Sequence, residues 1–452
     1  MVGKFFLQTY GCQMNVYESG VVRKILADAG FDETTDESSA DLLLMMTCSV
    51  RSHAEARALG RLADFRSLRA RHPGRLVGVL GCMAQRYGDE LVKSALVDIV
   101  VGPDEYLRLP ELIEECRTGS RGLVATRLSS ECYDQVKPEP ANPVSAFVTV
   151  MRGCDNYCSY CIVPYVKGRE RSRPLGLVLD EVRALVDRGI KDITLLGQNV
   201  LAYRDGHHDF AELLAAVARA AGSARVRFLT SHPRDLSDKV LHTMAETDNV
   251  CPSLHLPLQS GSDRILALMN RGYTRAQYLR LVARARALLP GLALSTDVMV
   301  AFPGETEADF LDTIDIVQRV RFDSAYMFRF SARPGTRAAE LEPKVSAADS
   351  GRRLARLIEV QNRITLELNR TMVGQSYELL IEGPSPRGRG ALGRTRSGKV
   401  VVVADPVPAG ALVVARVTHL NGWTPVAQLV RSKPVARCSG SYQPACPDSP
   451  ES

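Results

Sequence analysis

Three cysteines lie within eight positions of the segment RGCDNYCSYCIVPYVKGRERSR, residues 152–173. Cys154, Cys158 and Cys161 follow a predicted strand in the pattern C-x3-C-x2-C. A structural zinc site needs four ligands in a closed tetrahedron, and this segment offers no fourth cysteine or histidine. An iron–sulfur cluster is usually held by four thiolates, so three thiolates leave one iron open. The spacing favours a cluster with an open iron; buried thiols, or zinc with a distant fourth ligand, are the alternatives.

A second set of cysteines is dispersed over the first hundred residues. Cys12, Cys48 and Cys82 each come one or two residues after a predicted strand. In a doubly wound sheet the carboxyl ends of parallel strands lie along one edge, so these thiols can meet there. Taken singly, each is more often a small buried apolar residue. We predict a second three-thiolate site, and we interpret the remaining cysteines as structural or incidental: Cys116, Cys132, Cys251, Cys438 and Cys446.

The elements that must position these cysteines follow a regular order. Strand-like runs alternate with helical patterns over residues 1–130, which predicts a doubly wound α/β domain. Its expected strands are 4–10, 42–47, 76–81 and 98–102. Residues 131–145 contain three prolines and little apolar content, and we predict a linker there.

A second alternating series occupies residues 146–370 and predicts a partial (β/α)6 barrel. Its expected strands are 146–152, 193–197, 226–230, 253–258, 292–300 and 325–330. Short β runs over residues 371–434 predict a small β-barrel, in which residues 387–399 are expected to form a turn-rich loop. Residues 435–452 are polar and rich in Pro and Ser, and we predict a disordered tail.

Composition is that of an ordinary soluble protein. The chain has 452 residues, of which 45% are apolar and 24% charged, with a net charge of +6. This length predicts two to four domains, and no apolar run approaches the roughly 20 residues that span a bilayer. The first residues do not form a secretory signal, so we expect a cytoplasmic protein whose eleven cysteines serve as ligands or core residues more than as disulfides.

With these residues in hand, the chain resembles the radical SAM methylthiotransferases over nearly its whole length. That family combines an N-terminal domain with three dispersed cysteines, a radical SAM core and a C-terminal β-barrel of the TRAM type. Six stretches are similar to the branch that modifies isopentenyladenosine in bacterial tRNA: TYGCQMN, TCSVR, GCMAQR, GQNVLAY, TSHP and LHLPLQSGSDRILALMNRGYT.

The resemblance implies cofactors and their ligands. Two 4Fe-4S clusters and S-adenosylmethionine (SAM) are expected, with one cluster on Cys154, Cys158 and Cys161, the core cysteines. The other is expected on Cys12, Cys48 and Cys82, the auxiliary cysteines. The core cluster would cleave SAM to a radical that abstracts a ring hydrogen, and the auxiliary cluster would deliver the methylthio group. All six cysteines are therefore expected to be catalytic residues, because they would bind the two clusters that take part in the reaction. Further cofactor contacts are implied for Tyr160, Gln198, Gln259 and Ser260, and for the strand and turn at 297–307.

Basic residues predict contacts with RNA. The run after the third core cysteine would face an anionic substrate beside the radical site, and a second basic group lies in the predicted β-barrel. These candidates are Lys167, Arg169, Arg171, Arg173, Arg387, Arg389, Arg394, Arg396 and Lys399. A solvated face that only keeps the protein soluble is the alternative for both groups. An anticodon loop offers unpaired bases that a barrel-mouth site can accept.

We therefore predict an enzyme that converts isopentenyladenosine at position 37 of tRNA to its 2-methylthio form. Methylthiolation of threonylcarbamoyladenosine in tRNA or of a ribosomal-protein aspartate is the alternative of the same chemistry. An RNA-binding protein with structural metal sites is the non-enzymatic alternative. The expected partners are the tRNA anticodon loop, a flavodoxin-type electron donor and a sulfur source, with no membrane, and the enzyme is expected to be a monomer.

Overall fold

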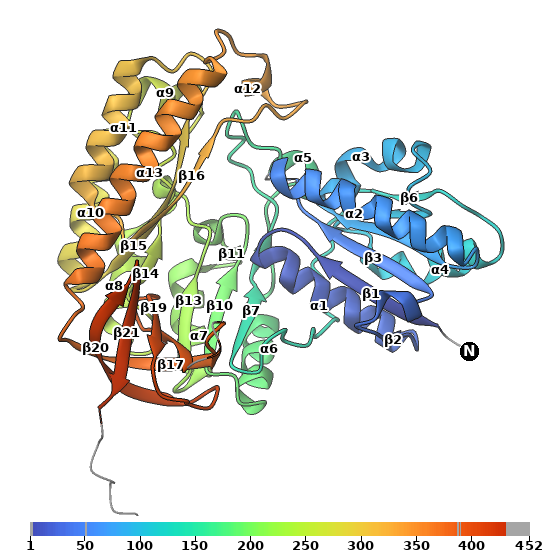
Figure 1. Ribbon diagram of the computed structural model, residues 1–452, viewed down its shortest axis with the longest axis horizontal. Coiled ribbons are helices and arrows are strands. Elements are labelled where there is room, and N and C mark those ends of the chain that lie inside the picture. Colours follow the sequence, from blue (N-terminus) through green and yellow to red (C-terminus); the bar gives the residue numbers. More distant parts are fainter. Residues whose placement is uncertain (1–2, 50–51, 387, 389, 431–452) are drawn as a thin grey trace, which may run out of the picture.

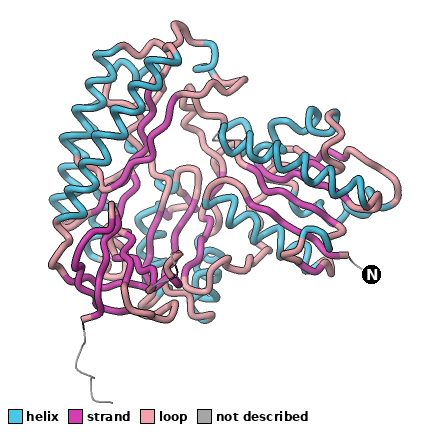
Figure 2. The backbone as a smooth tube through the Cα atoms, viewed as in Figure 1, coloured by secondary structure: helices cyan, strands magenta, loops and turns pink. Residues whose placement is uncertain are grey.

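The computed structural model describes residues 3–49, 52–386, 388 and 390–430. Three parts follow one another along the chain, an N-terminal α/β domain, a half-open barrel and a small β-barrel (Figure 1). Strands form the centre of the first two parts and helices cover their outer faces (Figure 2). The predicted tail at 435–452, with Cys438 and Cys446, lies outside the described residues.

The N-terminal domain is built on one parallel sheet of strand order β2-β1-β3-β4-β5-β6. Its strands are β1 (Lys4–Thr9), β2 (Asp32–Glu33), β3 (Leu42–Thr47), β4 (Leu76–Gly81), β5 (Ile99–Val101) and β6 (Leu123–Ala125). Its helices are α1 (Gln13–Asp28), α2 (Ser52–Arg71), α3 (Cys82–Lys93) and α4 (Leu109–Arg117), with short 3-10 turns η1 (Glu37–Ser39) and η2 (Tyr106–Arg108). One apolar core joins α1 and α4 to the sheet and another joins α2 and α3 to its other face, which confirms the doubly wound fold.

The central part contains six parallel strands in two three-stranded sheets, β13-β10-β7 and β14-β15-β16. These strands are β7 (Ser145–Thr149), β10 (Asp192–Leu196), β13 (Arg225–Phe228), β14 (Ser253–His255), β15 (Ala293–Val300) and β16 (Ser324–Arg329). Two-stranded pairs join β8 (Met151–Arg152) to β9 (Arg171–Ser172) and β11 (Arg204–Asp205) to β12 (His208–Asp209). One large apolar core unites both sheets with the surrounding helices, so the predicted partial barrel is confirmed.

Helices cover the outside of this barrel, and α10, α11 and α13 lie side by side over β14, β15 and β16 (Figure 1). The helices are α5 (Val163–Lys167), α6 (Leu175–Asp187), α7 (Phe210–Ala221), α8 (Asp238–Glu246), α9 (Asp263–Leu268), α10 (Arg275–Leu288), α11 (Glu307–Val320), α12 (Arg337–Glu340) and α13 (Ala347–Arg370). Short 3-10 turns are η3 (Val200–Ala202) and η4 (Pro233–Asp235). None of the helices in the described ranges is long and apolar enough to cross a membrane.

The segment expected to be a linker is packed against both domains that it joins. Tyr133 is fully buried, its ring stacks on Tyr106 with centroids 5.4 Å apart, and its hydroxyl donates to the carbonyl of Pro103 at 2.7 Å. The guanidinium of Arg152 lies over the same ring at 4.9 Å. An aromatic anchor of this kind restricts the relative movement of the two domains.

The C-terminal part is a closed five-stranded barrel of order β17-β18-β19-β21-β20. Its strands are β17 (Ser376–Pro384), β18 (Ala391–Thr395), β19 (Val400–Val403), β20 (Leu412–Asn421) and β21 (Thr424–Leu429). The small barrel is confirmed, but the turn-rich loop expected at 387–399 is wrong in part because β18 lies inside it. Gly393 explains the difference, since its place between Leu379 and Ile381 leaves little room for a side chain and suits a paired strand.

Two arginines of the large barrel hold the small one against the amino ends of the strands. Arg227 donates to the carbonyl oxygens of Arg396 at 2.7 Å and Thr395 at 3.0 Å, and it pairs with Asp192 at 2.9 Å. Arg225 reaches the carbonyl of Arg394 at 2.7 Å. Figure 1 shows the small barrel below β10, β13 and β14. The core cysteines follow β7 and β8, at the carboxyl end of the sheet.

Replacing Arg227 with methionine is expected to destabilise this junction by about 3–5 kcal/mol, because Asp192 would remain buried without its ion-pair partner. Urea unfolding followed by intrinsic fluorescence would measure the loss, and limited proteolysis would release the small barrel. Arg280→Met, on the exposed side of α10, should change stability by no more than about 0.5 kcal/mol. Equal stability of the two variants would contradict this role of Arg227.

Candidate functional site

The auxiliary cysteines meet at the carboxyl edge of the N-terminal sheet. Cys12 follows β1 and is the N-cap residue of α1, Cys48 follows β3, and Cys82 follows β4 and opens α3. Strands β1 and β3 are neighbours from which the chain turns in opposite directions along the sheet, so the site lies at a topological switch point. The order of the strands therefore brings together the loops that carry the three auxiliary cysteines, as predicted.

One glycine and two polar side chains bring these loops together. A side chain at Gly11, which has φ +131°, would meet the Cβ of Cys48 at 2.7 Å. Asn15 accepts a hydrogen bond from the Cys12 thiol at 3.3 Å and donates to the carbonyl of Thr47 at 2.8 Å. The Thr47 hydroxyl in turn donates to the carbonyl of Leu80 at 2.6 Å. These bonds tie together the ends of the three strands that carry the cysteines.

The three thiols differ in their electrostatic surroundings. A hydrogen bond with Cys48 lowers the pKa of Cys12 to about 6, assisted by the positive charge of Lys167. Burial raises the pKa of Cys82 to about 11. Iron deprotonates a thiol that it binds, and helix N-termini such as those at Cys12 and Cys82 favour the thiolate. The auxiliary site is thus suited to bind a metal cluster as thiolates.

The core cysteines lie in the loop that follows β8. A side chain at Gly153, with φ +76°, would collide with the carbonyl of Arg169 at 1.9 Å. The amide of Gly153 donates to Oε1 of Gln198 at 2.7 Å, and the amide of Cys154 donates to the carbonyl of Gly168 at 3.2 Å. The loop therefore needs glycine at 153, and Gln198 acts on it as a positioning residue.

A buried arginine that the sequence reading missed lies beside the core cysteines. Arg271 donates to the sulfur of Cys158 at 3.3 Å and lies 3.4 Å from the hydroxyl of Tyr160. Burial raises the pKa of Cys154 to about 11 and that of Cys161 to about 12. A cation here compensates thiolate charge in a buried site. The signal was present in the segment LMNRGYT, where Arg271 lies among the residues that carried the resemblance.

Both donor sets consist of thiols alone. In the ranges that the structure describes, no three His, Cys, Asp or Glu side chains are grouped so that they could hold a metal ion. In a cluster, by contrast, each thiolate binds a different iron. The three core thiols influence one another electrostatically, and the auxiliary thiols do so as well. Both groups of three thus suit a cluster with one open iron.

The predicted SAM contacts divide into two kinds. Oε1 of Gln259 is buried without a hydrogen-bond partner among the described residues, and Gln259 has φ +64° where its backbone bridges to β15. Such an orphaned acceptor fits a polar ligand at the ends of β14 and β15. Ser260 is fully buried, and its hydroxyl lies 3.4 Å from that of Thr313 and accepts from the amide of Ser262 at 3.3 Å. Ser260 therefore stabilises the turn, while Gln259 remains a candidate contact.

The basic run after the core cysteines requires a correction. Lys167 is buried and pairs with Glu18, and Arg171 pairs with Asp104, so neither is available to RNA in this structure. Arg173 is also buried and pairs with Glu181 at 2.6 Å. Of this run, Arg169 is open to solvent, with 80% of its side chain exposed, and its guanidinium pairs with Asp155 at 2.9 Å.

The basic residues of the small barrel require the same correction. Arg396 donates to the carbonyl of Val250 at 3.4 Å, and Lys399 pairs with Asp323 at 2.7 Å. Arg394 pairs with Glu382 on the neighbouring strand β17. These three side chains hold the barrels together or pair within the small barrel, and they do not form a free basic surface. Arg387 and Arg389 lie outside the described residues.

Two exposed aromatic residues beside the core cysteines were not predicted. Tyr157 lies between Cys154 and Cys158, and Tyr165 lies on α5; they are 44% and 50% exposed. Their rings meet edge to face with centroids 6.0 Å apart. Two exposed rings in contact with each other offer an apolar surface that a flat ligand can cover. Their position in the cysteine segment was the signal that could have found them.

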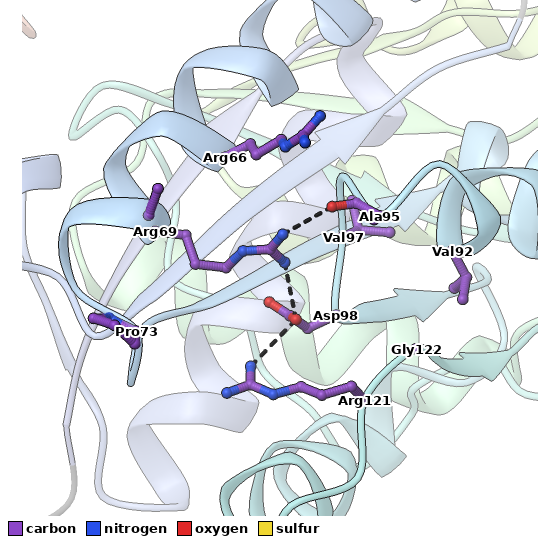
Figure 3. A pocket seen from close by; sticks show the side chains of 10 residues that line it. Arg66, Arg69, Pro73, Val92, Ala95, Val97, Asp98, Arg121 and Gly122 are labelled. Atoms are coloured by element: carbon purple, nitrogen blue, oxygen red, sulfur yellow. Dashed lines mark hydrogen bonds and ion pairs between the residues drawn. The ribbon is translucent and has the colours of Figure 1, made fainter.

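The cavity shown in Figure 3 is separate from the cysteines. It has a volume of ≈ 580 Å³ and lies at the amino end of β5, whereas the auxiliary cysteines follow the carboxyl ends of the strands. Asp98 pairs there with Arg69 at 2.9 Å and with Arg121 at 3.2 Å. We assign this cavity no part in the chemistry of the cysteines.

Family models match three successive regions of the chain. Residues 4–102 match the model described as uncharacterized protein family UPF0004, residues 148–317 the radical SAM superfamily and residues 370–430 the TRAM domain. Among solved structures, the chain is similar to a radical S-adenosylmethionine methyltransferase from Kitasatospora setae with cobalamin and a [4Fe-4S] cluster bound. That match has a TM-score of 0.58 and 17% identity, and it covers 75% of this chain and 77% of the other. It supports the fold.

Curated relatives match almost end to end. A tRNA-2-methylthio-N(6)-dimethylallyladenosine synthase from Phocaeicola vulgatus is 47% identical over 410 residues, covering 88% of this chain and 90% of the relative. A protein of the same name from Moorella thermoacetica is 43% identical, covering 93% of this chain and 96% of the relative. The chain therefore belongs to the tRNA-2-methylthio-N(6)-dimethylallyladenosine synthase family of radical SAM enzymes.

Proposed function

We propose that this enzyme methylthiolates isopentenyladenosine, also called dimethylallyladenosine, at position 37 of tRNA. The target is the ring carbon between the two nitrogens of the six-membered ring. The observation that carries the proposal is the pairing of two three-cysteine sites in adjoining domains, because sulfur insertion needs a sulfur-carrying group beside the site that activates SAM. Relatives that are 43% and 47% identical carry the name of this activity.

The chain uses SAM and two 4Fe-4S clusters as cofactors. When bound, these groups supply the electron transfer, the radical chemistry and the sulfur. The residues of the chain hold and shield them. Arg271 donates to Cys158, Gln198 fixes the cysteine loop through Gly153, and Ile162 packs in one small apolar cluster with Cys82.

The substrate is tRNA, and we propose the anticodon loop as the part that enters the site. Tyr157 and Tyr165 present exposed rings beside the core cysteines, on which unpaired bases can stack. Arg169 adds an exposed positive charge next to them. The TRAM domain would contact the RNA through surfaces other than its docked arginines. A flavodoxin-type electron donor, an external sulfur source and a monomeric state remain predictions.

Changing both Tyr157 and Tyr165 to alanine is expected to lower kcat/KM for tRNA by about 10- to 100-fold, because each base stacked on an aromatic ring is worth about 1–3 kcal/mol. Most of the change should appear in KM, measured with a radiolabelled tRNA transcript. The matched control is the double phenylalanine variant, which keeps both rings and should stay within about twofold of wild type. A KM unchanged in the alanine variant would rule out this stacking surface.

Nucleoside mass spectrometry tests the proposed function directly. tRNA from a deletion strain should accumulate isopentenyladenosine without its 2-methylthio form, and the intact gene should restore the modification. Unchanged isopentenyladenosine would sink the proposal and favour threonylcarbamoyladenosine or a ribosomal-protein aspartate as the substrate. The non-enzymatic alternative does not hold, because the relatives that establish the family are enzymes.

A further inference from the structure

A buried ion cluster joins the N-terminal domain to the radical SAM core beside the auxiliary cysteines. Glu18, on α1, has no exposed surface and receives hydrogen bonds from both domains. Tyr106 donates at 3.0 Å from its own domain, while Arg152, at 3.1 Å, and Lys167 approach from the core. Because one carboxylate binds two cations of the other domain, this contact depends on charge as well as on packing.

Further buried charges extend this cluster. A second buried carboxylate, Asp104, pairs with Arg152 at 3.5 Å and with Arg171. The neighbouring Arg173 is also buried and pairs with Asp134 at 2.8 Å and with Glu181 at 2.6 Å. The described cations and carboxylates of this group therefore balance, and removing any one of them leaves a buried charge without its partner.

One short helix links the two cysteine sites and carries part of this charge. Helix α5 begins two residues after Cys161 and ends at Lys167. Ile162, the N-cap residue of this helix, and Val166, within it, pack against Cys82 in a small apolar cluster. Lys167 then pairs with Glu18 on α1, the helix whose N-cap is Cys12. The position of Lys167 is therefore coupled to core and auxiliary sites at once.

Lys167 lies beside the auxiliary site. Val166, its neighbour in α5, packs against Cys82, and its partner Glu18 belongs to the helix that Cys12 caps. An oxidised 4Fe-4S core carries two positive charges and three thiolates carry three negative ones, so the assembly is anionic and becomes more so on reduction. A fixed cation beside it stabilises the reduced form more than the oxidised form.

We propose that Lys167, held in place by Glu18, is a positioning residue that docks the auxiliary cluster on the radical SAM core and raises the reduction potential of that cluster. The inference rests on the auxiliary cluster of the proposed function. A purely structural ion pair would hold the domains together in the same way, but it would leave the potential independent of the signs of these two charges.

The test uses the full chain with Cys154, Cys158 and Cys161 changed to alanine, so that only the auxiliary cluster is formed on anaerobic reconstitution with iron and sulfide. A potentiometric titration followed by electron paramagnetic resonance measures its reduction. Adding Lys167→Met should shift the equilibrium about tenfold toward the oxidised cluster, about 59 mV for one electron. Lys167→Arg keeps the charge and should match the parent within about threefold.

The direction in which a substitution at Glu18 shifts the reduction potential distinguishes an effect of charge from an effect of packing. Glu18→Gln removes a negative charge and should shift the equilibrium about tenfold in the opposite direction. The double variant Glu18→Gln, Lys167→Met should return toward the parent. Shifts of the same sign in both single variants, or none in either, would overturn the inference. If the Lys167→Met variant does not fold, the Glu18→Gln variant alone tests the inference. An unchanged or lowered reduction potential in Glu18→Gln would overturn it.

The same experiment distinguishes this inference from the proposed function. Absence of any cluster in the parent without core cysteines would reject the auxiliary site on Cys12, Cys48 and Cys82, and the inference with it. A reducible cluster whose potential ignores Glu18 and Lys167 would reject only the inference.

Discussion

Replacing Cys154 with alanine is expected to reduce SAM cleavage to less than about a thousandth of the wild-type rate, because loss of one of three ligands removes the electron path to SAM. Formation of 5′-deoxyadenosine, measured by liquid chromatography after anaerobic reduction with dithionite, checks this result. Methylthiolated tRNA should disappear together with it.

The matched control is Cys132→Ala, which makes the same substitution at a partly buried thiol outside both sites. It should retain about eight irons per chain, as expected for two clusters, and wild-type cleavage. Cleavage that survives in Cys154→Ala at more than a tenth of the wild-type rate would contradict the assignment of the core ligands.

Replacing Cys48 with alanine should separate the two half-reactions. The core cysteines lie in another domain and keep their hydrogen bonds with Arg271 and Gly168, so SAM cleavage should remain within about threefold of wild type. Methylthiolated nucleoside should be undetectable by mass spectrometry, and iron should fall to about four per chain.

Cys116→Ala serves as the control here, because Cys116 is a buried thiol of the same domain whose sulfur contacts the carbonyl of Asp98 at 3.8 Å. That variant should form product normally once folded. If Cys48→Ala loses cleavage and methylthiolation equally while four irons remain bound, the proposed division of labour between the two sites is refuted.

The sequence predicted the framework of the chemistry well because local patterns determine it. The strands at 42–47 and 76–81 have the predicted bounds, and the cysteines that follow them meet because parallel strands end at one edge. The short strands β2 and β6 were missed, since two or three residues carry no periodic signal. In the small barrel β18 was missed because Gly393 within it and the glycines that flank it are typical of turns.

The basic residues could not be assigned from sequence because their partners are distant in the chain. Lys167 lies 149 positions from Glu18, and Arg171 lies 67 from Asp104. A run of charged residues in the sequence shows the sign and the density of charge. It does not show whether buried carboxylates elsewhere in the chain pair with these residues. The same limit applies to Arg271, whose contact with Cys158 spans 113 positions.

The docking of the small barrel below the strands sets a minimum size for the RNA that this enzyme can grasp at both ends. The strand β10, with the docked Asp192 at its start and Gln198 just after its end, runs for five residues, or about 16 Å at roughly 3.3 Å per residue. The TRAM barrel lies at one end of such strands and the core cysteines at the other. A nucleic acid that contacts both must extend at least this far along the protein. An isolated anticodon loop can therefore occupy only the mouth of the large barrel. The distance between the small barrel and the core cysteines thus sets the shortest RNA that can contact both.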